Sequence, residues 1–158
     1  MAIEVLSRED EGKVGALGIA SGFSDIQGLV MDLGGGSTQI TWMIAHNGSV
    51  LTSPQGAFSF PYGAAALTRR LAELKAGKSK DEAEKAMAKL RAEMKSNFLN
   101  AYNGLEIPIE LTWRAKIEGG FQLYLSGGGF RGWGYLLLYL SQIHTQTYPI
   151  SIINGFMA

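Results

Sequence analysis

The chain has no cysteine and only two histidines, and these shortages exclude several kinds of site. Without cysteine among its 158 residues, it cannot form disulfides, thiolate zinc sites or a thiol nucleophile. His46 and His144 are too few for an imidazole metal cluster. The chemistry that remains uses oxygen ligands and backbone amides.

The chain also lacks net charge and long apolar runs. Its 14 Lys and Arg balance 14 Asp and Glu, so no global field attracts nucleic acid or an anionic membrane. No basic N-terminal region precedes a long apolar run, and the longest apolar-rich segment, residues 133–140, is too short to span a bilayer. We therefore expect a cytoplasmic protein with neither nucleic acid nor membrane as partner.

Glycine, in contrast, is abundant, and charge is distributed unevenly. The 21 glycines make up about 13% of the chain, against a usual share of about 7%. Residues 69–95 hold nine basic and five acidic side chains, whereas Arg131 is the only charged residue from 119 to 158. This pattern indicates a solvated helical pair beside an apolar C-terminal third. The apolar end of the chain indicates a piece of a longer protein.

Hydrophobic patterns predict a mixed α/β fold. Residues 28–33 form an apolar run closed by three glycines, which is typical of a buried strand ending in a tight turn. An Asn-Gly pair at 47–48 predicts a hairpin between two further strands. The other helices and strands are predicted from the spacing of apolar residues and from residues that typically start or end a helix. In chain order, the predicted strands are 3–6, 28–33, 38–45, 50–52 and 121–125, and the predicted helices are 7–19, 64–75, 79–103 and 131–141.

The most specific stretch is residues 32–39, which read DLGGGSTQ. Consecutive glycines let backbone N–H groups approach an anion and form a nest suited to phosphate. Ser37 and Thr38 add hydroxyl donors, and Asp32 can hold Mg²⁺ or orient an attacking water. The alternative interpretation is a glycine-rich strand turn that Asp32 merely caps.

This stretch resembles the second phosphate-binding loop of the actin, sugar-kinase and heat-shock ATPase superfamily. Within that superfamily it is most similar to the exopolyphosphatase and guanosine pentaphosphate phosphohydrolase family, whose loop reads DxGGGSTE, here with Gln39 in place of the final Glu. Upstream, residues 7–13 (SREDEGK) match the start of a helix in that family. Downstream, residues 60–63 (FPYG) match its LPxG segment.

The resemblance covers nearly the whole chain and implies a ribonuclease-H-like (actin-like ATPase) domain, with a mixed sheet and helices, as one lobe of a two-lobed protein. The family's first phosphate loop, DxGS, does not precede Asp32. We therefore expect residues 1–158 to be a single second lobe that is inactive alone. Residues 1–27 would connect the lobes, residues 28–148 would form the core, and residues 149–158 would begin the next segment.

The resemblance also implies Mg²⁺-dependent attack of water on a terminal phosphate of polyphosphate or a guanosine polyphosphate. The family's proposed general base maps onto Glu11, and Asp32 would be the metal ligand. Without the resemblance, the acids around Glu11 read as first-turn residues favoured by the helix dipole. The predicted phosphate-binding residues are Gly34, Gly35, Gly36, Ser37, Thr38, Gly127, Gly128, Gly129 and Arg131.

Residues 126–133 (SGGGFRGW) depart from the Gly-Gly-Thr turn of the family and resemble a fungal regulatory branch that links mitochondrial state to nuclear transcription. This departure leaves catalysis open. Arg131 can clamp phosphate near a helix N-terminus or lie on the surface against Trp133.

The alternative function is a non-catalytic sensor that binds ATP or another phosphate ligand and signals to a regulatory protein partner. In either case the missing N-terminal lobe would be a further partner. A third alternative is a dimerisation or scaffold role for the apolar C-terminal third.

Overall fold

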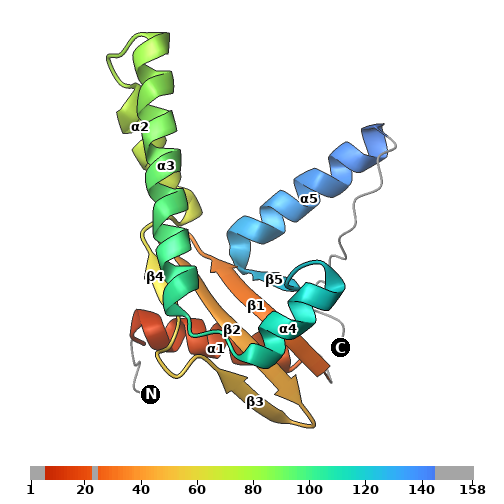
Figure 1. Cartoon of the computed structure of the whole chain (residues 1–158). Coiled ribbons are helices and arrows are strands. Elements are labelled where there is room, and N and C mark those ends of the chain that lie inside the picture. Colours follow the sequence, from red (N-terminus) through yellow and green to blue (C-terminus); the bar gives the residue numbers. More distant parts are fainter. Residues whose placement is uncertain (1–5, 23–24, 145–158) are drawn as a thin grey trace, which may run out of the picture.

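A mixed β-sheet forms the centre of the molecule (Figure 1). The computed structural model describes residues 6–22 and 25–144, and at residues 8, 9, 11–13 and 141–144 it describes the backbone alone. The strand order is β3-β2-β1-β5, and β4 also pairs with β2. The strands are β1 (Asp25–Leu33), β2 (Thr38–His46), β3 (Ser49–Thr52), β4 (Phe58–Phe60) and β5 (Leu123–Ser126). The helices are α1 (Arg8–Ala20), α2 (Ala64–Lys75), α3 (Lys80–Gly104), α4 (Ile109–Glu118) and α5 (Gly127–His144).

Strand pairing brings the ends of β1 and β5 together. β1 pairs antiparallel with β2, and Asp32 lies opposite Gln39. β1 also pairs parallel with β5, and there Asp32 lies beside Ser126. Because parallel strands end at the same sheet edge, the glycines that follow β1 and those that follow β5 lie at one edge.

Helices cover both faces of the sheet. On one face α1 packs on alternate residues of β1 and β2, in a buried cluster of Ala16, Ala20, Ile26, Val30, Met43 and Ala45. On the other face α3 and α4 pack on β2, in a cluster of Ile40, Trp42, Ala101, Leu105 and Leu111. Side chains alternate between faces along a strand, so Asp32 and Gln39 belong to the face that α1 covers.

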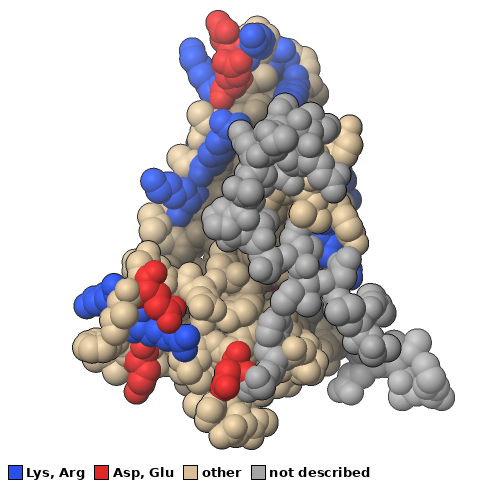
Figure 2. Space-filling model, turned by 90° about the vertical axis from the view of Figure 1, so that its right-hand side faces the viewer, with Lys and Arg blue, Asp and Glu red and all other residues tan. Residues whose placement is uncertain are grey.

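Helices α2 and α3 form a hairpin arm that rises from the sheet (Figure 1). Its base is anchored by aromatic packing, with the Phe60 and Phe98 ring centroids 4.8 Å apart, and by an Asn97 amide that donates to the Tyr62 hydroxyl. Figure 2 shows Lys and Arg gathered over the tip of the arm. Within the described part of the chain the arm has one ion pair, Arg70 with Glu73. The predicted solvated helical pair is thus confirmed.

The predicted α/β class is confirmed, and two elements were not predicted. Helix 64–75 matches α2, and the predicted helix from Ser7 matches α1, where Ser7 Oγ accepts from the Asp10 N–H. Strand β4 and helix α4 went unpredicted. The predicted strand 3–6 and the final segment 149–158 fall on residues that the structure does not describe, apart from Leu6, which is not in a strand.

The predicted start of the last helix near Arg131 is wrong, because α5 begins at Gly127. Gly127 has a φ of 90°, a left-handed value that favours glycine. This conformation turns β5 directly into α5 without a loop. No helix in residues 6–22 and 25–144 is long and apolar enough to cross a membrane.

Candidate functional site

The glycine loop between β1 and β2 is held by the first turn of α2. The Ala64 N–H donates to the Gly34 carbonyl with an N–O distance of 2.9 Å. The N–H groups of Ala65 and Ala66 donate to the Gly35 carbonyl at 2.9 and 3.1 Å. These N–H groups have no partner inside their own helix, so the loop satisfies donors that α2 would otherwise leave open.

This attachment directs two other N–H groups away from α2. No cis peptide bond occurs in the described segments, and in a trans peptide the N–H points opposite to the C=O. Because the carbonyls of Gly34 and Gly35 face α2, the N–H groups of Gly35 and Gly36 face the opposite way. Neither N–H has a backbone acceptor among the described residues, and both glycines are exposed. Hydrogen bonding of a carbonyl also polarises its peptide, which strengthens the outward donors.

The steric surroundings separate glycines that the fold requires from glycines that it does not. A β-carbon on Gly63 would lie 2.3 Å from the Gly36 carbonyl carbon, so only glycine fits between the loop and α2. A β-carbon on Gly35 or Gly36 would meet nothing within 4 Å. Neither residue has a positive φ. Glycine at positions 35 and 36 therefore leaves the loop backbone open to a ligand without being needed for folding.

Asp32 is the penultimate residue of β1, beside this loop, and is half-buried on the sheet face that α1 covers. A β-carbon on Gly15 of α1 would lie 3.8 Å from Asp32 Oδ2, and one on Gly127 would lie 2.8 Å from Oδ1. The carboxylate thus lies between two stretches of bare backbone. Mg²⁺ is often held by one or two carboxylates together with substrate phosphates, and a single carboxylate in this position fits that requirement. Among the described residues no group of three or more His, Cys, Asp or Glu could hold a metal ion.

The second glycine segment lies next to Asp32, and packing requires glycine at two of its three positions. β-Carbons on Gly127 and Gly129 would lie 2.4 Å from Leu33 O and Leu33 Cγ, so both glycines allow α5 to pack on the end of β1. Gly128 is exposed, and its β-carbon position is open. Arg131 is exposed in the second turn of α5, not at the helix start.

The two predicted hydroxyl donors differ in their surroundings. The Thr38 hydroxyl is buried and donates to the Tyr62 carbonyl at 3.1 Å, so its proton is used inside the fold. The Ser37 hydroxyl is half-buried and accepts from Gln39 Nε2 at 2.8 Å. Sequence reasoning assigned no role to Gln39 or to Gly63, because no local pattern indicates that the start of α2 packs on the loop.

The predicted base, Glu11, lies on α1 one turn before Gly15. Residues i and i+4 share one face of a helix, and Gly15 approaches the Asp32 carboxylate. The backbone therefore places position 11 on the face of α1 that approaches the end of β1. The structure describes the backbone alone at this position, and the role of Glu11 stays a prediction.

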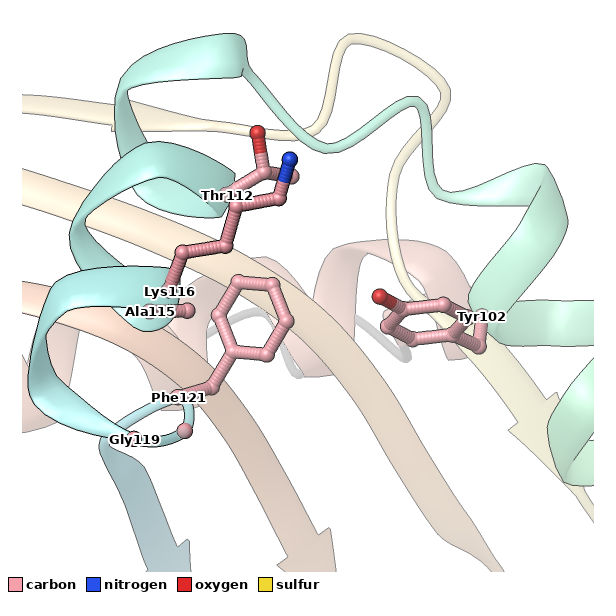
Figure 3. A pocket seen from close by; sticks show the side chains of 7 residues that line it. Tyr102, Thr112, Ala115, Lys116, Gly119 and Phe121 are labelled. Atoms are coloured by element: carbon pink, nitrogen blue, oxygen red, sulfur yellow. The ribbon is translucent and has the colours of Figure 1, made fainter.

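A separate groove of about 590 Å³ lies between α4 and the end of α3 (Figure 3). The Phe121 and Tyr102 rings face each other edge to face across it, with centroids 6.2 Å apart. Phe121 packs on the cluster beneath α3 and α4, on the opposite face of the sheet from Asp32. The groove is therefore distinct from the glycine-loop site.

Comparisons with known proteins identify the relatives of this chain. The model of the Ppx/GppA phosphatase family matches residues 1–115. The chain is also similar to Retrograde regulation protein 2 of Saccharomyces cerevisiae, with 41% identity over 155 residues, which are 98% of this chain and 24% of that protein. The chain thus spans about a quarter of the length of this curated relative. On these matches, the chain belongs to the Ppx/GppA phosphatase family.

Proposed function

We propose that the chain supplies the phosphate-binding loop of a phosphoanhydride hydrolase. Its substrate would be polyphosphate or a guanosine polyphosphate. The observation that carries this proposal is the pair of outward N–H groups at Gly35 and Gly36 beside the Asp32 carboxylate. Exposed backbone donors that face away from the fold suit the oxygens of a terminal phosphate.

The chemistry would be attack of water on the terminal phosphorus. The loop N–H groups and the Ser37 hydroxyl would bind the phosphate oxygens. Glu11 would take the proton of the attacking water as the new P–O bond forms and the anhydride P–O bond breaks. Mg²⁺ held by Asp32 would neutralise phosphate charge.

The proposal extends to the architecture of the complete protein. We propose that residues 1–158 form a single ribonuclease-H-like lobe, with other segments of a cytoplasmic protein supplying the opposite wall of the site. The antiparallel β1, β2 and β3 with β5 parallel to β1 are compatible with such a lobe. Because the chain spans 24% of its yeast relative, the proposed activity is assigned to the complete protein and not to residues 1–158 alone.

Phosphate release by the full-length protein tests this function. Polyphosphate and guanosine pentaphosphate serve as substrates, with Glu11→Gln and Asp32→Asn as variants. We expect each variant to lower turnover at least about a hundredfold. Equal background release by the wild type and both variants would count against hydrolysis.

A second candidate function is a non-catalytic phosphate sensor with a regulatory protein partner. The similarity to a protein named for retrograde regulation favours it. Calorimetric titration of the full-length protein with Mg·ATP, polyphosphate and guanosine tetraphosphate separates the two functions. Binding without phosphate release supports the sensor, and absence of binding to all three ligands counts against both functions.

A further inference from the structure

Helix α4 turns its largest apolar side chains toward solvent. Leu111 is buried in the core beneath the helix. In contrast, Ile109, Trp113 and Ile117 are 74%, 65% and 69% exposed. Residues four apart are neighbours on a helix surface, so these three side chains form one row on the outer side of the helix, the α4 stripe. Contiguous exposed apolar side chains usually mark a surface that binds another molecule.

The α4 stripe borders the groove between α4 and the end of α3. Figure 3 shows Thr112 and Lys116 of α4 near the Phe121 ring, with the Tyr102 ring of α3 across the groove. Tyr102 is also exposed, so the apolar surface continues across the groove onto α3. A surface made by two helices comes closer than one stripe to the roughly 800 Å² per partner of a standard interface.

The α4 stripe is complementary to itself when two copies meet in opposite directions. Trp113 lies midway between Ile109 and Ile117, four residues from each. If a second α4 packs antiparallel about a twofold axis at Trp113, the two Trp113 side chains meet at the centre. Each Ile109 then lies at the level of Ile117 of the second copy. Twofold pairing is the commonest form of homo-oligomer and requires a self-complementary patch, so the pattern favours a second copy of this chain as the occupant.

Charges beside the α4 stripe fit the same antiparallel arrangement. Glu110 and Arg114 are four residues apart and lie along one side of the stripe. A twofold axis places this side against the same side of the second copy in reverse order, so each Glu110 lies close to an Arg114. Glu110 has no ion pair within residues 6–22 and 25–144. Arg114 binds Glu118 Oε1 through Nε, and the other N–H donors of a guanidinium can bind a second carboxylate.

We propose that α4 is a self-association surface through which two copies of the chain form a symmetric dimer. The two helices are antiparallel, with the Trp113 side chains at the centre and Glu110–Arg114 ion pairs on one side. The dimer goes beyond the proposed hydrolase and does not depend on it. The α4 stripe and Asp32 belong to opposite faces of the sheet, so dimerisation leaves the glycine loop open to a phosphate ligand.

Sedimentation equilibrium of the full-length protein tests for the dimer. An apolar surface of this small size gives a weak contact, so we expect a dissociation constant of roughly 1–100 µM. Trp113→Glu places a charge at the centre of the contact and should raise this constant at least about a hundredfold. Ala88→Glu is the matched control, because it adds the same charge at an exposed position of the α2–α3 arm, and it should dimerise like the wild type.

Two charge reversals test the antiparallel register. Glu110→Arg would bring arginines together at both ion pairs of the dimer, and Arg114→Glu would bring glutamates together. Each variant alone should therefore dimerise at least about tenfold more weakly than the wild type. An equimolar mixture of the two variants pairs arginine with glutamate at both places. The heterodimer should therefore regain roughly the wild-type affinity, which a purely structural effect of either substitution would not allow.

Circular dichroism first checks that each variant is folded. If Trp113→Glu is unfolded, Ile117→Gln replaces it, since Ile117 is also exposed. A wild type that stays monomeric well above the expected concentration range overturns the proposal. A dimer that these substitutions in the α4 stripe do not weaken overturns it as well. If both charge variants lose dimerisation and their mixture does not recover it, the antiparallel pairing is wrong.

Discussion

At the scale of single residues, Gly36 and Gly63 touch each other but have opposite steric requirements. A β-carbon on Gly63 would press on the Gly36 backbone at 2.3 Å, whereas one on Gly36 meets open space. We predict that Gly63→Ala lowers the free energy of unfolding by about 1–3 kcal/mol, because backbone atoms must move. Urea denaturation measures the loss.

Gly36→Ala is the matched variant. We expect it to weaken phosphate binding and to leave folding stability almost unchanged. We expect its free energy of unfolding to change by less than about 0.5 kcal/mol, while the methyl group beside the outward N–H weakens phosphate binding about tenfold. If Gly36→Ala instead unfolds the protein and Gly63→Ala does not, the steric assignment of the loop is wrong.

Sequence reasoning located the loop but could not assign its inner contacts. The position of Asp32 at a strand end follows from a local pattern, an apolar run followed by glycines, and the structure agrees. The hydrogen bond from Thr38 to Tyr62 joins residues 24 apart, and no local pattern reports such a bond. Position 63 likewise requires glycine only because the start of α2 packs on the loop.

At the scale of elements, Trp42 joins the sheet to the segment between α3 and α4. Its indole N–H donates to the buried Leu105 carbonyl at 2.9 Å. Trp42→Phe leaves this carbonyl without its donor, which should lower the free energy of unfolding by about 1–3 kcal/mol in urea denaturation. Trp113 on α4 is 65% exposed. Trp113→Phe should therefore change the free energy of unfolding by less than about 0.5 kcal/mol. Equal effects of the two substitutions would contradict this bridging role.

The start of α3 should lose stability in acid. The Ser79 hydroxyl, the Ser79 N–H and the Lys78 charge, in that order, hold the pKa of Glu82 below its ordinary value of 4.5. A lowered pKa means that the carboxylate stabilises the fold above about pH 4.5 and that this stability is lost as pH falls through the lowered value. Glu82→Gln should therefore lower the thermal midpoint at neutral pH but not in acid.

Glu84→Gln is the control for this pH dependence. Glu84 is exposed on the same helix, and its side chain forms no hydrogen bond with any residue that the structure describes. We expect its substitution to leave the acid part of the stability profile unchanged. A difference between Glu82→Gln and the wild type that persists at low pH would exclude the capping box as its source.

Elements with strong local signals were predicted, and those that depend on their neighbours were not. The capping box of Ser79 and Glu82 is readable in sequence, and the structure confirms it. Helix α4 is short, and its apolar residues include the exposed Ile109, Trp113 and Ile117, which blur the pattern of a buried face. The start of α5 was misplaced because three glycines are usually a turn, whereas here two of them, Gly127 and Gly129, pack on Leu33.

At the scale of the whole molecule, two helical projections leave the sheet and differ in surface character. The α2–α3 arm and α5 extend in diverging directions (Figure 1). The arm is charged, as expected for a solvated surface (Figure 2). On α5, Trp133, Leu136 and Tyr139 are 49%, 55% and 60% exposed. Large apolar side chains gathered on one element usually mark a surface that another part of a protein covers.

Hydrogen exchange can test whether the longer protein covers α5. Helix α5 contacts β1 and β5, and a helix gains most of its stability from packing of its apolar residues. We predict that amides of α5 exchange about tenfold or more slowly in the full-length protein than in the chain of residues 1–158. Amides of the charged arm should exchange at equal rates in the two proteins, because a charged surface is expected to stay exposed to solvent in both. Equal protection of α5 in the two proteins would show that its apolar surface is not a contact within the longer chain, and would contradict the proposal that residues 1–158 are one lobe packed against another.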